Sequence, residues 1–193
     1  IAVIDAETDP FLHGRIPRPF LWGFYDGERY ETFTDADALV DWLETQRLIV
    51  YAHNGGRFDY HFFFDRIEEG TEITVINGRI AKFKIGDCEF RDSYNLLPVP
   101  LAQMQKDEVD YAIFEESERN KPGNRKVIED YLRADCVYLW NWVTQFVDEY
   151  GMHLTTAGTA MKKWSAISGR KPPRDIGGVL YRGLSPYYYG GRC

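Results

Sequence analysis

The chain has 193 residues, 44% of them hydrophobic and 16% aromatic, which is enough for one domain with a packed core. Its net charge of −7 argues against a basic nucleic-acid-wrapping protein or a membrane-surface protein, because both hold phosphates with positive fields. The three cysteines are odd in number and far apart, which argues against a disulfide framework or zinc cluster and favours a reducing, intracellular compartment.

The sequence also lacks the signals of membrane proteins and secreted proteins. No segment approaches the roughly 18 apolar residues that a membrane span needs, and no signal peptide precedes the first strand. The chain begins inside a predicted strand without a methionine, so we expect it to be a fragment of a longer protein.

The first predicted element is a buried strand that ends in acids. Residues 1–4 are apolar, and Asp5, Glu7 and Asp9 follow. Asp5 and Glu7 would project from one face of the strand about 7 Å apart. A divalent cation would relieve their repulsion, although a solvated strand end explains the pair alone more simply. We assign Asp9, which precedes Pro10, to the turn.

The next segments predict a hairpin and a helix. Residues 20–26 and 29–34 alternate as two antiparallel strands would, with a glycine between them. Thr34 or Asp35 can cap a helix over residues 36–46, where apolar residues fall at helical spacing.

A strand, a turn and a helix are predicted next. Residues 47–53 are apolar on both faces, which is typical of a central strand, and residues 58–67 predict a helix. The glycines between them suggest a phosphate loop, but no Lys-Ser or Lys-Thr follows. A simple turn at Asn54, with Asp59 favouring the helix dipole, explains the glycines. It does not explain Asn54 and Phe58.

The second half of the chain completes the predicted sheet and adds helices. Residues 71–93 predict strands, with Asn77-Gly78 forming a tight hairpin turn. Residues 156–168 predict a short helix, and the remainder shows no periodicity. Strands followed by mixed strands and helices predict an α/β or α+β fold with a mixed central sheet.

A long amphipathic helix is predicted from residue 125 to about residue 150. It carries Tyr131 and Asp135 four residues apart, so the hydroxyl and the carboxylate share one face. Asp135 lies in the apolar stripe, where a charge is costly unless it is coordinated. A hydrogen-bonded Tyr–Asp pair at the edge of the core explains the pattern equally well.

Together these elements can bring four acids to one point of a sheet. A strand end, a helix start and the middle of another helix contribute them, with one tyrosine beside them. Such an oxygen-rich site suits two hard cations, Mg²⁺ or Mn²⁺. The set is Asp5, Glu7, Asp59, Asp135 and Tyr131.

At these residues the sequence resembles the proofreading 3′→5′ exonuclease domain of family B DNA polymerases. The family's three motifs are similar to "DAE" at 5–7, "NGGRFD" at 54–59 and "YLRAD" at 131–135, in that order. A tyrosine in the third motif is typical of the tyrosine branch of four-acid (DEDDy) exonucleases. The resemblance implies an α/β, ribonuclease H-like fold with a mixed central sheet flanked by helices.

Three further segments resemble the protein-primed branch of the family, found in small phages, linear plasmids and related viruses. "RDSYNLLPVPL" at 91–101 is similar to a Ser-Leu segment that grips the primer end, and "KDEVDY" at 106–111 to a lysine motif. "YYYGGR" at 187–192 is similar to the Tyr-x-Gly-Gly segment that links exonuclease to polymerase. Its motif residues are Tyr188, Gly190 and Gly191.

The resemblance covers the whole chain and implies its organisation and partners. Residues 1–150 would form the exonuclease domain, and residues 151–193 a helix and linker toward a polymerase domain. The implied partners are the 3′ end of single-stranded DNA or a frayed primer terminus, the polymerase domain and a terminal protein primer, with no membrane. The implied location is the host cytoplasm of a phage or virus.

The implied reaction is hydrolysis of the terminal phosphodiester, releasing a nucleoside 5′-monophosphate. Asp5, Glu7 and Asp135 would hold one cation, and Asp5 and, through water, Asp59 the second. Two further residues complete the implied catalytic set: Tyr131 would orient the attacking water, and Lys106 would neutralise charge on the phosphate.

The resemblance also implies contacts to single-stranded DNA. Aromatic rings would stack on or wedge between the last bases, an interaction indifferent to sequence. Core packing remains open for Phe62 and its neighbours, and a structural hydrogen bond for His53. The implied contact residues are Thr8, Tyr51, His53, Asn54, Phe58, Phe62, Ser93 and Tyr94.

Two other functions remain open for this fold. One is a free-standing 3′→5′ DNA or RNA exonuclease, against which "YYYGGR" argues. The other is a non-catalytic domain that binds single strands, against which the presence of all four acids argues.

Overall fold

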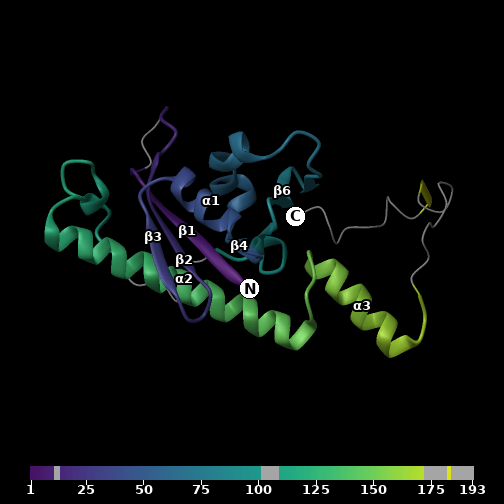
Figure 1. The fold of residues 1–193 in the computed structure, drawn as a ribbon. Coiled ribbons are helices and arrows are strands. Elements are labelled where there is room, and N and C mark those ends of the chain that lie inside the picture. Colours follow the sequence, from purple (N-terminus) through teal and green to yellow (C-terminus); the bar gives the residue numbers. More distant parts are fainter. Residues whose placement is uncertain (11–13, 101–108, 172–181, 184–193) are drawn as a thin grey trace. The chain divides into compact units, whose positions relative to one another are not determined.

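The computed structural model describes residues 1–10, 14–100, 109–171 and 182–183. The chain divides into two compact units, residues 1–156 and residues 157–193. The first contains a seven-stranded mixed sheet in the order β3-β2-β1-β4-β7-β6-β5 (Figure 1). Its strands are β1 (Ala2–Thr8), β2 (Pro19–Tyr25), β3 (Tyr30–Phe33), β4 (Ile49–Ala52), β5 (Thr74–Ile76), β6 (Arg79–Ile85) and β7 (Cys88–Asp92).

The centre of the sheet is parallel and its margins are antiparallel. Strands β1, β4 and β7 run parallel to one another. The β2–β3 and β5–β6–β7 strands pair antiparallel on either side, as the predicted hairpins require. With helices packed against it, this sheet confirms the predicted α/β class.

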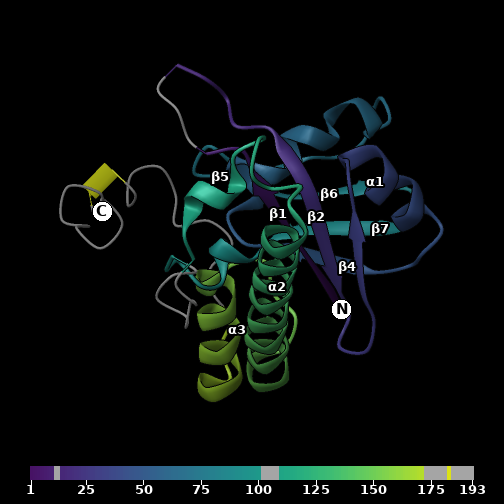
Figure 2. The ribbon, with the colours of Figure 1, turned by 90° about the vertical axis from the view of Figure 1, so that its left-hand side faces the viewer.

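Helices cover the two faces of the sheet, α1 (Ala36–Glu44) on one and α2 (Pro122–Tyr150) on the other (Figure 2). Alternation along β1 separates two hydrophobic cores, because successive side chains point to opposite faces. Ala2 and Ile4 pack with α1, whereas Val3 between them packs with α2. The predicted cap of α1 is Asp35, whose carboxylate accepts the amide of Ala38 at 2.8 Å.

The segment predicted as a helix over residues 58–67 adopts 3₁₀ geometry instead. It forms η2 (Asp59–Arg66), and the turn before it forms a second 3₁₀ helix, η1 (Gly55–Arg57). Tyr60 and Phe63 are both fully buried. Their spacing of three matches the three residues per turn of a 3₁₀ helix, which places both rings in the core.

The predicted short helix is α3 (Thr156–Ser168), which belongs to the second unit from its second residue onward. The boundary between the units lies close to the predicted boundary at residue 150, and their roles as functional domains stay a prediction. Within the described ranges, no helix has both the length and the apolar run that crossing a membrane requires.

One glycine allows η1 to pack directly on β6. A Cβ at Gly56 would lie 1.9 Å from the carbonyl oxygen of Ile80, a distance that no side chain can tolerate. The amide of Gly56 instead donates to the buried carboxylate of Asp92 at 3.3 Å. A larger residue would therefore push the 54–59 turn off the sheet.

We predict that Gly56→Ala lowers the free energy of unfolding by about 2 kcal/mol or more, because the new methyl group would overpack this contact. Urea denaturation followed by circular dichroism measures the change. The matched control is Gly123→Ala in the first turn of α2, where a Cβ would meet nothing within 4 Å. That substitution should range from neutral to about 1 kcal/mol stabilising. Equal effects at the two positions would contradict the prediction.

Candidate active site

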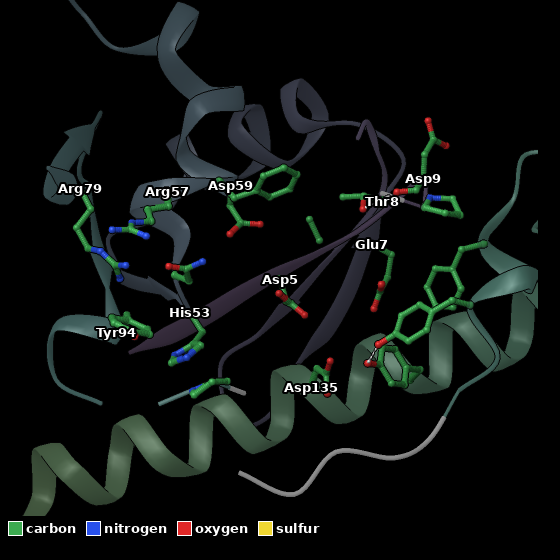
Figure 3. A pocket seen from close by; sticks show the side chains of 18 residues that line it. Asp5, Glu7, Thr8, Asp9, His53, Arg57, Asp59, Arg79, Tyr94 and Asp135 are labelled. Atoms are coloured by element: carbon green, nitrogen blue, oxygen red, sulfur yellow. Dashed lines mark hydrogen bonds between the residues drawn. The ribbon is translucent and has the colours of Figure 1, made fainter. Parts of the chain in front are cut away.

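A cleft of about 900 Å³ lies at the carboxyl ends of the parallel strands (Figure 3). The end of β1, the turn after β4 and the segment after β7 meet there, and α2 closes one side. Ligands of open α/β sheets bind at this kind of edge. Two 3₁₀ turns, η3 (Ser93–Asn95) and η5 (Tyr111–Phe114), also contribute to the lining.

Three carboxylates form the tightest cluster in the cleft. One ligand oxygen from each of Asp5, Glu7 and Asp135 lies within 4.8 Å of the other two. Glu7 and Asp135 are buried, and Asp5 is half-buried. Acids this close repel one another, and hard cations with oxygen ligands relieve such repulsion.

Asp59 lines the same cleft but lies outside this triplet. It is 5% exposed at the start of η2. Burial, together with the nearby Asp92 carboxylate, raises the pKa of Asp59 to about 7. A cation stabilises the charged form of a carboxylate, and the oxygen donors of the cleft fit a hard divalent ion.

Close packing of α2 on the sheet sets the position of Asp135. Gly23 pairs with Asp5 across β1 and β2, and a Cβ there would lie 2.9 Å from Leu132 Cγ and 3.0 Å from Cys136 Sγ. The helix therefore approaches β2 as closely as the backbone allows. Burial and the nearby acids raise the pKa of Cys136 well above its ordinary value, so the thiol adds no further negative charge.

Tyr131 reaches the cleft one helical turn before Asp135. It is 6% exposed, and its hydroxyl lies 3.4 Å from the hydroxyl of Tyr111. Tyr111 was not singled out from the sequence, although it lies in the segment that resembles the lysine motif. Its position shows that η5 folds over the tyrosine face of α2.

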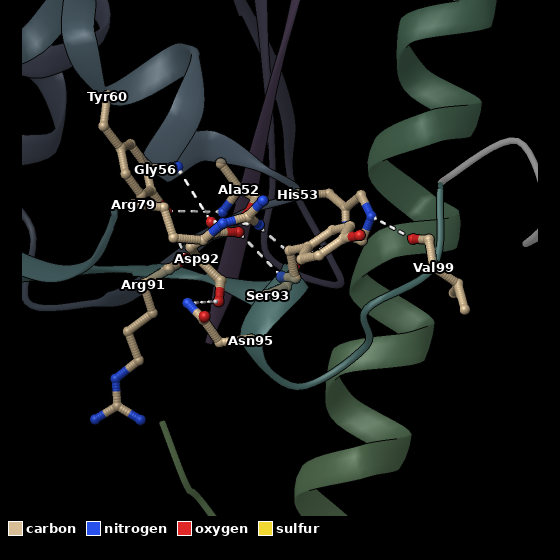
Figure 4. A network of polar contacts seen from close by, with 11 residues as sticks. Ala52, His53, Gly56, Tyr60, Arg79, Arg91, Asp92, Ser93, Asn95 and Val99 are labelled. Atoms are coloured by element: carbon tan, nitrogen blue, oxygen red, sulfur yellow. Dashed lines mark hydrogen bonds and ion pairs between the residues drawn. The ribbon is translucent and has the colours of Figure 1, made fainter. Parts of the chain in front are cut away.

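Both ring nitrogens of His53 form hydrogen bonds within the protein (Figure 4). Nε2 donates to the carbonyl of Val99 at 2.8 Å, and Nδ1 lies 3.0 Å from the hydroxyl of Ser93. Burial lowers the pKa of His53, so the ring is neutral near pH 7. His53 lines the cleft, but these bonds match the structural alternative left open for it.

Two of the residues predicted to contact single-stranded DNA are fully buried and do not line the cleft. Tyr51 lies in the core beneath α2, because the central position of β4 places its ring there. The hydroxyl of Ser93 bonds His53 and the carbonyl of Ala52. DNA contact by either residue stays a prediction.

The remaining predicted contacts divide by position. Phe62 packs against Trp22 and Phe58, with ring centroids 6.2 and 5.3 Å away, which matches the core-packing alternative. The residues that line the cleft, and for which DNA contact stays a prediction, are Thr8, Asn54, Phe58 and Tyr94. Outside the described residues lie Lys106, Tyr188, Gly190 and Gly191.

Asp9 does more than close a turn. Its amide does bond the carbonyl of Arg18 at 3.0 Å, but its side chain is 10% exposed and pairs with two arginines. Arg15 lies 2.7 Å from one carboxylate oxygen, and Arg119 pairs with the other. The Arg119 guanidinium also stacks 4.3 Å above the ring of Phe20. Asp9 thus ties the end of β1 to the segment that precedes α2.

The comparisons with known proteins found phage DNA polymerases. No family model matches the chain. It is 41% identical over 199 aligned positions to a DNA-directed DNA polymerase of Enterobacteria phage PRD1, covering 100% of this chain and 35% of that protein. The chain therefore spans about a third of the length of this relative.

Two solved structures of Phi29 DNA polymerase have a similar fold. The complex with primer-template DNA matches with a TM-score of 0.74 at 15% identity, over 98% of this chain and 39% of that chain. The complex with single-stranded DNA matches with a TM-score of 0.66 at 14% identity, over 86% and 34%. At these identities the likeness shows the fold alone, and it is the fold that the sequence resemblance implied.

The Asp9 ion pairs lead to a prediction about stability. We expect Asp9→Asn to lower the free energy of unfolding by about 1–3 kcal/mol, because it leaves the largely buried Arg119 without its carboxylate. Urea denaturation measures the change. The matched control is Asp87→Asn, whose partner Arg47 is 85% exposed at 3.7 Å and which should change stability by less than about 0.5 kcal/mol. The prediction is wrong if the two variants unfold alike.

Proposed function

Because the chain is homologous over its whole length to part of a phage DNA polymerase, and resembles the protein-primed, family B type, we propose that it is a 3′→5′ proofreading exonuclease. The triplet of Asp5, Glu7 and Asp135 in an open cleft carries this proposal. Phosphodiester hydrolysis by two cations requires a set of acids of this kind, which β1 and α2 bring together here.

The proposed cofactors are two divalent cations, Mg²⁺ or Mn²⁺. Asp5, Glu7 and Asp135 would hold one, and Asp5 and Asp59 would hold the other, Asp59 through water. When bound, such ions lower the pKa of water and stabilise charge on both sides of an in-line displacement. The protein's part is to fix the carboxylates: β1 presents Asp5 and Glu7 from one face, and the close packing of α2 presents Asp135 opposite.

Tyr131 is proposed to orient the attacking water. A tyrosine hydroxyl has a reference pKa of about 10 and is a poor base at neutral pH, so its role is to position the water rather than to remove its proton. The hydroxyl of Tyr111, 3.4 Å away, can restrict the orientation of Tyr131.

The proposed substrate is the 3′ end of single-stranded DNA, including a frayed primer terminus. A duplex end hides the terminal phosphodiester, whereas a single strand can enter the cleft and stack a base on Phe58 or Tyr94. The polymerase domain and the terminal protein primer are proposed partners by homology, and a location inside the host cell follows from the same premise.

The central prediction is metal-dependent degradation of 5′-labelled single-stranded DNA. With Mg²⁺ or Mn²⁺ we expect products shortened one nucleotide at a time from the 3′ end, and none with chelator. Asp5→Ala/Glu7→Ala should lower the rate on the order of a thousandfold or more, because two cation ligands are lost. A denaturing gel measures both, and circular dichroism checks that the variant folds.

Other outcomes separate the open alternatives. Binding without degradation by the wild-type chain would favour the non-catalytic single-strand-binding function. Equal degradation of an oligonucleotide with 2′-hydroxyl groups would favour a general DNA or RNA exonuclease. Equal rates for the wild-type chain and the double variant would reject the catalytic assignment of the carboxylates.

A second prediction tests the tyrosine pair. We expect Tyr131→Phe to lower kcat about 10- to 100-fold, because the water loses its orienting hydroxyl, and Tyr111→Phe to lower it less. The matched control is Tyr138→Phe on the same helix, which does not line the cleft and should keep the wild-type rate. A loss for Tyr138→Phe as large as that for Tyr131→Phe would show a general effect on α2 instead.

A further inference from the structure

The cleft carries its positive charge at one end. Among the described residues that line it, the cationic side chains are Arg57 and Arg79. Figure 3 shows both at the end that also holds Tyr94, with Glu7 and Asp9 at the opposite end. Because the chain has a net charge of −7, two guanidinium groups at one end of the cleft contrast with its generally negative charge.

Arg79 is held rigidly at the edge of the cleft. Its side chain is 7% exposed and lies 3.4 Å from the carboxylate of Asp92 (Figure 4). The guanidinium also stacks 4.0 Å above the ring of Tyr94. The amides of Gly56 and Tyr94 fix that carboxylate in turn. A guanidinium has five N–H donors, and within the described part of the chain Arg79 uses one of its side-chain donors, toward Asp92. Its other side-chain donors have no hydrogen-bond partner among the described residues, and the side chain lines the cleft.

Arg57 comes from the neighbouring element. It ends η1, is exposed and makes no ion pair or hydrogen bond through its side chain to another described residue. The contact between Gly56 and Ile80 presses η1 against the start of β6, which carries Arg79. Arg79 pairs with the carboxylate of Asp92, whereas Arg57 has no carboxylate partner among the described residues. An anion between the two guanidinium groups would relieve their excess positive charge.

We propose that Arg57 and Arg79 together bind one internucleotide phosphate of the single strand, on the 5′ side of the phosphodiester that is cut. This inference rests on the proposed exonuclease function. Guanidinium groups match phosphate oxygens through paired N–H···O bonds, which a lone ammonium group cannot reproduce. The strand then crosses the cleft from the basic end to the carboxylates of Asp5, Glu7 and Asp135.

Such a contact acts on binding more than on the chemical step. The phosphate that it holds does not react, so its contacts are equally strong in the ground state and the transition state. Loss of the contact therefore raises KM and leaves kcat nearly unchanged. A cation ligand or Tyr131 would show the opposite pattern, which makes the two kinetic constants diagnostic.

The test combines Arg57→Gln with single-stranded DNA that carries one uncharged methylphosphonate at the second, third or fourth linkage from the 3′ end. On unmodified DNA we expect Arg57→Gln to raise KM about tenfold, the loss of one charge-assisted contact. At the linkage that the two arginines bind, the methylphosphonate should raise the KM of the wild-type chain by a similar factor. On that modified DNA, Arg57→Gln should raise KM by less than a further twofold. At the other linkages the two effects should multiply.

Two controls and one further readout complete the design. Arg47→Gln removes the same charge from a residue that is 85% exposed and does not line the cleft, and its KM should stay within twofold of wild type. Arg79→Lys should raise KM severalfold although the charge is kept. In the Asp5→Ala/Glu7→Ala background, Arg57→Gln should make the slope of log affinity against log salt shallower by about 0.7, as for one lost single-strand phosphate contact.

The outcomes distinguish this inference from the function on which it rests. The phosphate site is overturned, and the exonuclease function is kept, if the wild-type chain degrades DNA in either of two cases. In the first, Arg57→Gln does not raise KM on unmodified DNA. In the second, it raises KM equally whichever linkage carries the methylphosphonate. If the wild-type chain neither degrades nor binds single-stranded DNA, the proposed function itself fails.

Discussion

Mutual repulsion among carboxylates is the constraint on which the rest of this structure depends. Two unit charges about 5 Å apart repel by roughly 3 kcal/mol at the effective dielectric of a protein surface. Asp5, Glu7 and Asp135 are held at or within that distance. The opposing force comes from the second hydrophobic core, in which Leu132 and Leu139 pack α2 against the sheet. Hydrophobic packing of α2 thus keeps the carboxylates close together, and bound cations can relieve their repulsion.

Two glycines next to the cleft determine where its charged side chains lie. At Gly23 the absence of a side chain lets α2 reach β2, and at Gly56 it lets η1 reach β6. The contact of α2 with β2 brings Asp135 to the other acids, and the contact of η1 with β6 brings Arg57 to Arg79. These two close contacts therefore give the cleft a negative end and a positive end, which the overall net charge does not reveal.

Much of the fold and of the acid set could be predicted from sequence, because both rest on local patterns. Alternation and turn chemistry identified the strands, and helical spacing placed Tyr131 and Asp135 on one face of α2. The sequence was less informative where a pattern does not determine what packs against it. The apolar residues of β4 predict a central strand, but they do not show that α2 covers the face on which the ring of Tyr51 lies.

Long-range partners were equally invisible in the sequence. Asp9 reads as a turn residue until Arg119, 110 positions away, is seen against it. Arg57 lies inside a recognised motif, but its importance appears only when the β5–β6 hairpin brings Arg79 beside it. Periodicity describes a chain one element at a time, whereas these side chains derive their role from elements that meet only in the folded sheet.

The path of α2 also bears on how the protein is made. Asp135 follows Asp5 by 130 positions, so the carboxylate triplet is a contact of very high sequence separation. Such contacts close late, after the sheet that supports them. A growing chain on the ribosome would then present only two of the three acids until α2 emerges and docks. The complete carboxylate triplet is therefore assembled only when the fold is nearly complete.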